Sequence, residues 1–370
     1  MNVRAASPAT LIFPAVNRLA TDYWRAARLV GEPTLLAASV AGDAAQFDGQ
    51  TVLRLPMIHE AGFDSGFRDL IEKHAIGRIF CPVASVYSHL QTWLPEHGQG
   101  VELLGDSPIR RQVDQHRELM AQARCLRSWM STCATDAEVL PEIEVAGLLR
   151  QAGLVHGESS DEKLAAMIAI AASAPAGDLV EIGALMGRTA LVLLYLARRY
   201  HIGPLLTVDP WQAAHAIHHD SPANIGRLVD EWDYELLAEA FFVNLAPWSG
   251  NDHAHLRMPS VQAFAVYSDG LPIATRESVV VPFSRRIAIL HVDGNHDHAA
   301  VKQDCELWVS RLLPGGWLIL DDYQWAHGDG PRRVGDELLE TCRQRIERAF
   351  VCGKAMFIRL GAESSQGGMV

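Results

Sequence analysis

The sequence predicts an α/β protein with a parallel sheet in each of two domains. Short apolar runs alternate with stretches of helical length through most of the chain, which is the pattern of βαβ units. In the second half, several of these apolar runs end in polar residues. At 370 residues the chain exceeds a usual single domain, so two domains are expected.

Residues 1–105 are expected to form a small α/β domain of their own. Strands are predicted at 9–16, 33–40, 51–56, 78–83 and 101–104, and helices at 17–30, 63–75 and 85–94. Two stretches, 77–94 and 101–108, faintly resemble the domain that precedes ATP-grasp folds, but no ATP-grasp body follows. We therefore expect an accessory domain that shapes a substrate pocket or an oligomer interface.

The rest of the chain divides into a helical linker at 106–157, a larger domain at 158–360 and a disordered tail at 361–370. The linker is predicted to hold helices at 108–130 and 142–152. A turn at 157–161 is expected to cap a helix at 162–173. Further on, the sequence predicts a helix from Asn224 to Asn244 and a hairpin of strands near 350–352 and 354–360.

Composition excludes several classes of protein. The formal net charge of −12 argues against a nucleic-acid surface, which would need clustered Lys and Arg. The six cysteines are scattered without a C-x-x-C motif, which is typical of reduced, mostly buried thiols in a cytoplasmic protein. No run approaches the ~18 apolar residues of a membrane span, so a soluble chain is expected.

A glycine turn joins the strand predicted at 179–182 to an apolar helix at 190–199. Gly183 and Gly187 lie in this turn, where the helix N-terminus opens. Glycine permits unusual backbone angles and a close approach of the backbone to a ligand. The spacing is neither G-x-G-x-x-G nor a P-loop, which disfavours a nicotinamide dehydrogenase. Alone, the turn is equally compatible with a tight strand–helix connection.

The neighbouring strands strengthen the ligand-binding interpretation. A strand at 205–208 ends in Asp209, whose carboxylate could accept hydrogen bonds from ribose hydroxyls. A strand at 287–292 ends in Asp293, and another at 317–320 ends in Asp321 and Asp322. Polar residues at the carboxyl ends of several strands are less expected by chance than one glycine turn, and an α/β sheet binds ligands at these ends.

The sequence at this point resembles a known family. "VEIGALMGRTA", "HVDGNHDHAAVKQDCELWVSRLLPGGWLILDDY" and "GPRRVGDELL" are similar to class I S-adenosylmethionine-dependent methyltransferases. They most resemble the metal-dependent natural-product group that contains the macrocin and mycinamicin sugar O-methyltransferases and the cephalosporin hydroxylase protein. The resemblance covers about residues 158–360. It implies a Rossmann-like sheet with helices on both faces and an acceptor pocket supplied by residues 211–284 and the N-terminal domain.

The resemblance also implies roles for individual residues. Those expected to bind S-adenosylmethionine are Glu181, Gly183, Ala184, Gly187, Asp209, Ser260 and Asp293. Within this set the turn holds the methionine end, Asp209 holds the ribose, and Ser260 replaces the acidic residue often found at the adenine.

A metal ion and a catalytic base are implied as well. Asp293, Asp321 and Asp322 would repel one another without a cation, and oxygen ligands suit Mg²⁺. From the residues alone, one aspartate capping a helix and the others solvated is the simpler interpretation. His296, in the D-G-x-H arrangement, is the expected general base in preference to His298. The run at 218–220 could suggest a metal site, but a solvated loop is favoured.

The expected function is Mg²⁺-assisted O-methylation of a small polar metabolite or sugar-bearing natural product. One alternative is a relative that binds S-adenosylmethionine but methylates nitrogen or carbon, or serves another reaction. Another is a non-catalytic partner protein with a vestigial site. A small-molecule acceptor and a homo-oligomer are the expected partners.

Overall fold

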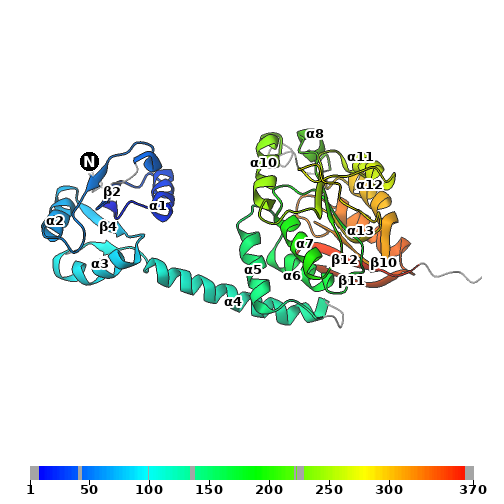
Figure 1. Ribbon diagram of the computed structural model, residues 1–370, viewed down its shortest axis with the longest axis horizontal. Helices are drawn as coiled ribbons and strands as arrows, with labels where there is room; N and C mark the ends of the chain where they lie inside the picture. The colour runs from blue at the N-terminus through cyan, green and yellow to red at the C-terminus, as the bar shows by residue number, and fades with distance from the viewer. Residues whose placement is uncertain are drawn as a thin grey trace, which may run out of the picture. The chain divides into compact units, whose positions relative to one another are not determined.

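The structure is a computed structural model that describes residues 8–40, 44–98, 100–133, 138–220, 222 and 229–362. The chain divides into two compact units, Met1–Glu118 and Leu119–Val370, and each is built around one sheet (Figure 1). Of the tail predicted at 361–370, residues 363–370 lie outside the described residues.

The first unit holds a five-stranded parallel sheet in the order β3-β2-β1-β4-β5, as expected for an α/β domain. Its first strand ends at Ile12, earlier than predicted, because Pro14 follows and has no N–H to donate to a ladder. The elements are β1 Ala9–Ile12, α1 Arg18–Leu29, β2 Thr34–Ala38, the 3₁₀ turn η1 Ala44–Phe47, β3 Val52–Arg54, α2 Phe63–Lys73, β4 Ile76–Phe80, α3 Ala84–His97 and β5 Glu102–Leu103.

The second unit holds a seven-stranded sheet in the order β11-β12-β10-β9-β6-β7-β8. Strand β12 is antiparallel to both of its neighbours, which confirms the predicted C-terminal hairpin. The strands are β6 Asp178–Ile182, β7 Leu205–Val208, β8 His253–Leu256, β9 Ile287–Val292, β10 Leu312–Leu320, β11 Ile346–Cys352 and β12 Ala355–Leu360. The helices are α4 Pro108–Cys133, which begins in the first unit, α5 Glu142–Gly153, α6 Asp161–Ala171, α7 Arg188–Arg199, α8 Ala213–Ala216, α10 Tyr234–Leu245, α11 Ser260–Ser268, α12 His298–Trp308, the 3₁₀ turn η2 Val309–Arg311 and α13 Gly330–Thr341.

Helices cover both faces of this sheet, as predicted. Successive strand residues point to opposite faces, so Leu179 packs into the core beneath α5, α6, α7 and α10, whereas Val180 packs beneath α11, α12 and α13. Strands buried on both faces read as continuous apolar runs. This explains why β6 and β9 could be recognised in the sequence.

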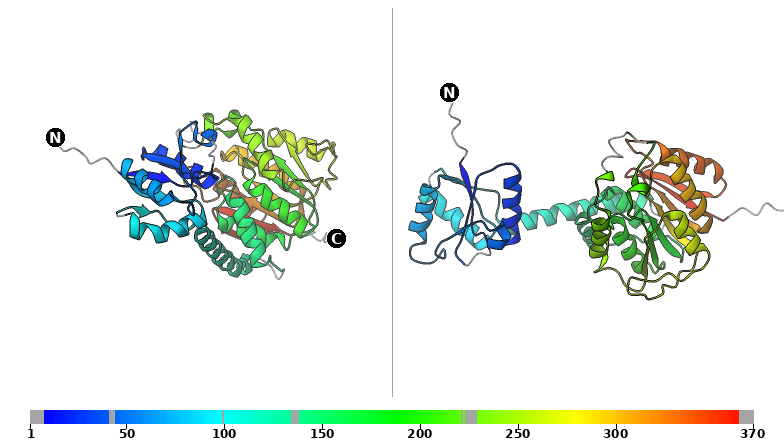
Figure 2. Two further views of the ribbon diagram at one scale, coloured as in Figure 1. Left: turned by 60° about the vertical axis from the view of Figure 1, so that its left-hand side comes forward. Right: turned by 90° about the horizontal axis from the view of Figure 1, so that it is seen from above.

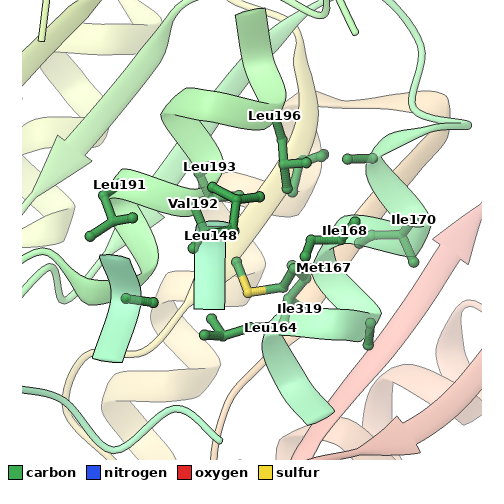
Figure 3. Close-up of a cluster of buried hydrophobic side chains, with 14 of the residues drawn as sticks. Leu148, Leu164, Met167, Ile168, Ile170, Leu191, Val192, Leu193, Leu196 and Ile319 are labelled. Carbon is green, nitrogen blue, oxygen red and sulfur yellow. The ribbon is translucent and has the colours of Figure 1, made fainter. Parts of the chain in front are cut away.

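The predicted linker contributes to the second unit's core. Leu126 and Met130 of α4 and Leu148 of α5 belong to the same buried cluster as α7. Figure 3 shows Leu148 beside Leu164 of α6 and Val192 of α7. Helices α5, α6 and α7 contact one another, and the two further views in Figure 2 show them on one side of the sheet. Residues 119–157 therefore form part of this unit rather than a spacer.

Two further sequence predictions can be compared with the structure. Helix α10 begins at Tyr234, where Asp233 caps it by accepting a hydrogen bond from Leu236 N. The predicted start at Asn224 lies outside the described residues.

The cysteines are all free, and four of the six are buried. In the described part of the chain, no helix is long and apolar enough to cross a membrane.

Candidate active site

The glycine turn after β6 is fixed by contacts within the protein. Gly183 has φ +84°, and a Cβ built on it would lie 1.9 Å from the backbone oxygen of Asp293. Gly187 has φ +89° and is the N-cap of α7, where a Cβ would meet Leu245 at 3.0 Å. Ala184, between them, is buried. The close approach of the Asp293 backbone therefore requires glycine at 183, and the left-handed conformation favours it at 187, before any ligand is considered.

Asp209 fixes the same turn from the end of β7. Its Oδ2 accepts from Leu185 N at 3.0 Å, and its Oδ1 accepts from Trp211 N at 2.8 Å. Trp211 returns a bond from Nε1 to the Leu185 carbonyl at 3.0 Å. Burial raises the pKa of Asp209, although these backbone donors oppose the change. Each carboxylate oxygen keeps a second lone pair, so the residue can order the turn and still accept from a ligand.

Glu181 lies beneath the turn and is fully buried in β6. Its Oε1 accepts from the Thr189 hydroxyl and lies 3.0 Å from Nδ1 of His291. Its Oε2 has no hydrogen-bond partner among the described residues. Buried carboxylate oxygens are rarely left unpaired, so this atom fits a ligand that donates to it. Burial lowers the pKa of His291.

Ser260 does not have the free side chain that an adenine contact would need. It is the first residue of α11, and its Oγ accepts from Nε1 of Trp308 at 2.8 Å. Its predicted role at the adenine is therefore not supported by any contact of the described residues.

The three aspartates after β9 and β10 come together, as expected from the pairing of Val292 with Leu320. Ligand atoms of two groups lie within 4.8 Å of one another: His291, Asp293 and Asp321 in one, and Asp293, His296 and Asp322 in the other. Asp322 has φ +49°, a left-handed conformation that is costly for a residue with a Cβ.

Lys163 of α6 is the residue that sequence reasoning missed. Its fully buried Nζ contacts Asp321 Oδ2 and lies 3.3 Å from Asp293 Oδ2 and 3.0 Å from Ser159 Oγ. Burial opposes its charge, but Asp293 and Asp321 together raise its pKa above the usual value. Burial would also raise the pKa of Asp321, yet Lys163 and the other donors hold it low. The sequence did contain a sign of this role. Lysine is disfavoured in the first turn of a helix, where the macrodipole is positive, so a lysine there indicates a negatively charged partner.

The predicted magnesium ligands thus already have cationic partners. Lys163 is paired with Asp293 and Asp321, and Nζ of Lys354 lies 3.1 Å from Oδ1 of Asp322. A divalent ion held by Asp293 and Asp321 would compete for the oxygen atoms that the ammonium of Lys163 contacts. In this arrangement the three aspartates do not fit Mg²⁺ as a set.

His296 faces the carboxylates, whereas His298 does not. Nε2 of His296 lies 3.4 Å from Asp322 Oδ2 and 4.0 Å from Asp293 Oδ1, and its Nδ1 is buried without a partner among the described residues. Burial lowers the pKa of His296, which favours the neutral ring. His298 instead lies 2.9 Å from Glu337 of α13.

The loop at 215–220 is bound to the loop that carries His296. Asp297 accepts from the backbone N–H groups of His219 and Asp220 at 2.8 and 2.9 Å, and Asp220 accepts from His298 N at 3.1 Å. His219 and Asp220 are exposed, as predicted. His218 is half-buried, and the centroid of its ring lies 4.6 Å from that of the His296 ring. The solvated-loop prediction is therefore wrong for His218.

Two histidines of β8, the buried His253 and the partly buried His255, predict a pH-dependent stability. Burial lowers the pKa of His253 to about 4 and that of His255 to about 3, while both share the hydroxyl of Thr207. In the unfolded chain these two histidines take up protons from about pH 6.5 downward, whereas in the folded chain they do not. The free energy of unfolding therefore falls as the pH falls through this range.

We expect His253→Asn to lower the pH dependence of the free energy of unfolding by about 1.4 kcal/mol per pH unit between about pH 6 and 4.5. Denaturant titrations measure the slope. The surface variant His201→Asn should keep it, and equal slopes in both variants would contradict the assignment.

Part of the chain matches a known protein family. Residues 180–323 match a protein family described as a methyltransferase domain. No curated protein sequence matches the chain significantly. Among solved structures, the O-methyltransferase NovP is similar at 16% identity, with 51% of this chain and 73% of that chain covered and a TM-score of 0.37.

Two other solved structures are similar at lower identity. An O-methyltransferase from Bacillus cereus in complex with SAH shares 10% identity over 66% of this chain and 91% of its own, with a TM-score of 0.33. The MycE methyltransferase, in complex with Mg, SAH and mycinamycin VI, shares 13% identity over 52% and 47%, with a TM-score of 0.31. All three scores lie below 0.5, so the fold rests on the strand order rather than on these likenesses. The family match places a methyltransferase domain over residues 180–323 of the second unit, on the seven-stranded sheet with helices on both faces.

Proposed function

We propose that the C-terminal unit methylates a hydroxyl group of a small polar molecule, with His296 as the general base. The observation that carries the proposal is the position of this imidazole. It is mostly buried, with 14% of its side chain exposed, beside Asp293 and Asp322 at the sheet edge where the glycine turn opens, and no lysine or arginine is paired with it in the described residues. A neutral ring in this position can take a proton from an acceptor hydroxyl.

The chain's own residues would hold the two reactants close together. S-adenosylmethionine supplies a methyl group on a sulfonium sulfur. Asp209 would accept from the ribose while it orders the turn, and the unpaired oxygen of Glu181 would accept from a donor of the methionine end. The acceptor oxygen gives its proton to Nε2 of His296 and takes the methyl group, while the electron pair of the carbon–sulfur bond stays on sulfur. Positioning of this kind accounts for much of the rate in two-substrate reactions.

The acceptor is proposed to bind among the aromatic rings around His296. The rings of His218 and Trp325 each lie 4.6 Å from that of His296 and approach it edge-on. Rings can cover the apolar face of a sugar or an aromatic acceptor and exclude water from the reacting hydroxyl. Of the structures compared, the MycE complex is described as holding mycinamycin VI, a natural product. A natural-product hydroxyl is therefore the proposed acceptor class.

The sequence resemblance also suggested Mg²⁺, and the MycE complex is described as containing it. The pairing of Lys163 and Lys354 with the three aspartates does not favour that ion here. The proposed mechanism therefore includes no step that depends on a metal.

Binding of the demethylated product, SAH, tests the proposal without an acceptor. Titration calorimetry should show SAH binding to the wild type. Asp209→Asn should weaken it by ~1–3 kcal/mol, about 5- to 150-fold, because the charged acceptor is lost. Trp211→Phe removes the indole bond to Leu185 and part of the ring packing but keeps the Asp209 carboxylate, so it should weaken binding less. Tight NAD binding without SAH binding would refute the proposal.

A further inference from the structure

We propose that the ammonium group of Lys163 is the resident cation of the Asp293–Asp321 pair, so that these two carboxylates together take no divalent metal ion. The inference rests on the proposed function in one respect, that Asp293 and its neighbours flank the reacting hydroxyl. It adds to that function by identifying Lys163 as the source of the positive charge beside these carboxylates.

The hydrogen bonding of Lys163 is complete. An ammonium group has three N–H donors, and Nζ has three acceptors: Ser159 Oγ, Asp293 Oδ2 and Asp321 Oδ2. The lysine side chain is 0% exposed, and that of Asp321 is 6% exposed. A buried ammonium without partners is strongly unfavourable, so Lys163 cannot leave these oxygens unless its charge is also removed from the interior.

Helix stability does not explain why a lysine occupies this position. Lys163 lies three residues after the N-cap Ser160, where the partial charge of the helix end is positive. The rest of α6 is an apolar helix buried against α7. What compensates the lysine is therefore the pair of carboxylates, which lie 130 and 158 positions further along the chain.

A metal ion held by His291, Asp293 and Asp321, one of the two groups with ligand atoms close together, would need the oxygens that Lys163 contacts. Mg²⁺ binds carboxylates in near-octahedral geometry and retains waters around it. To bind Asp293 and Asp321 together, it would have to stand beside or displace a charged ammonium that already bridges them. The remaining aspartate, Asp322, has its own ammonium partner in Lys354 at 3.1 Å. Each carboxylate of the cluster thus has a cation supplied by the chain.

Manganese binding tests this inference, because Mn²⁺ takes the same oxygen ligands as Mg²⁺ and its free ion is visible by electron paramagnetic resonance. We expect the wild type to leave the free Mn²⁺ signal unchanged. Lys163→Met should bind Mn²⁺ about tenfold or more tightly than the wild type, because removing one positive charge frees two carboxylates. Lys163→Arg, which keeps the charge, should behave as the wild type.

Lys302→Met is the matched control. Lys302 also pairs with a carboxylate, Glu337 at 2.8 Å, but on the surface of α12 and α13. Removing it should not create a comparable site. If its Mn²⁺ affinity rises as much as that of Lys163→Met, the gain is nonspecific and the inference fails.

The wild type decides the question even if Lys163→Met does not fold. Stoichiometric Mn²⁺ binding to the wild type that Asp321→Asn abolishes would overturn the inference, because the lysine would then have to yield to the ion. An unchanged signal, with a melting temperature unaffected by EDTA or Mg²⁺, supports it. SAH binding measured on the same samples separates the two proposals: its absence refutes the proposed function, whereas Mn²⁺ binding refutes only the role of Lys163.

Discussion

Methyl transfer by His296→Ala is expected to be about 10²–10⁴-fold slower in kcat than that of the wild type, because a general base typically contributes this factor. Cofactor affinity should change little, since none of the described contacts of His296 is with the glycine turn or Asp209. Radiolabelled methyl transfer to an acceptor found by screening natural-product hydroxyls gives the rate, and SAH calorimetry gives the affinity.

His298→Ala is the control for this experiment. It removes an imidazole from the same loop, but one that is paired with Glu337 rather than with the carboxylate cluster. Its rate should stay near that of the wild type. An inactive His298→Ala variant beside an active His296→Ala variant would show that the assignment is wrong by two residues. Equal activity of both variants would show that no histidine of this loop acts as the base.

Gly183→Ala is expected to lower the free energy of unfolding of the C-terminal unit by about 3–5 kcal/mol, because the new methyl group overlaps backbone and the residue must keep a left-handed conformation. The Cβ would lie 1.9 Å from Asp293 O, where no flexible side chain can move aside. Denaturant unfolding followed by tryptophan fluorescence measures the change. SAH binding should weaken as well, since the turn between β6 and α7 could not keep its present backbone conformation.

Gly270→Ala separates the two causes of that effect. Gly270 also has a positive φ, +71°, but a Cβ there would meet nothing within 4 Å. Only the backbone cost remains, and we expect a loss of about 1–2 kcal/mol. If both variants lose the same stability, the contact between the turn and the Asp293 backbone is not what requires glycine.

The sheet of the C-terminal unit was predictable because its strands are buried on both faces. The runs that became β6 and β9 are mostly apolar, and they are followed by the glycine turn and by Asp293, respectively. Periodicity placed Asp209, Asp293 and Asp322 at the carboxyl ends of their strands. That Asp293 and Asp322 come together was implied only by the family resemblance, because the pattern of single strands does not give their order in the sheet.

The contacts between side chains within the site could not be predicted from periodicity. Lys163 meets Asp321 only because α6 packs on the same face as α7, a tertiary contact that local pattern does not encode. The position of His218 depends on hydrogen bonds between two loops that lie 78 residues apart in the chain. In both cases a side chain that looks ordinary in sequence acquires its partner from packing between distant segments.

The packing of α4 and α5 has a practical consequence for dissecting this chain. A fragment cut at the boundary that the motifs suggest, near residue 158, would strip Leu126, Met130 and Leu148 from the helical layer over β6. The exposed apolar surface left on α6 and α7 would promote aggregation. The smallest piece suited to separate expression therefore starts upstream of Leu119, within α4, well before the region that carries any recognisable family motif.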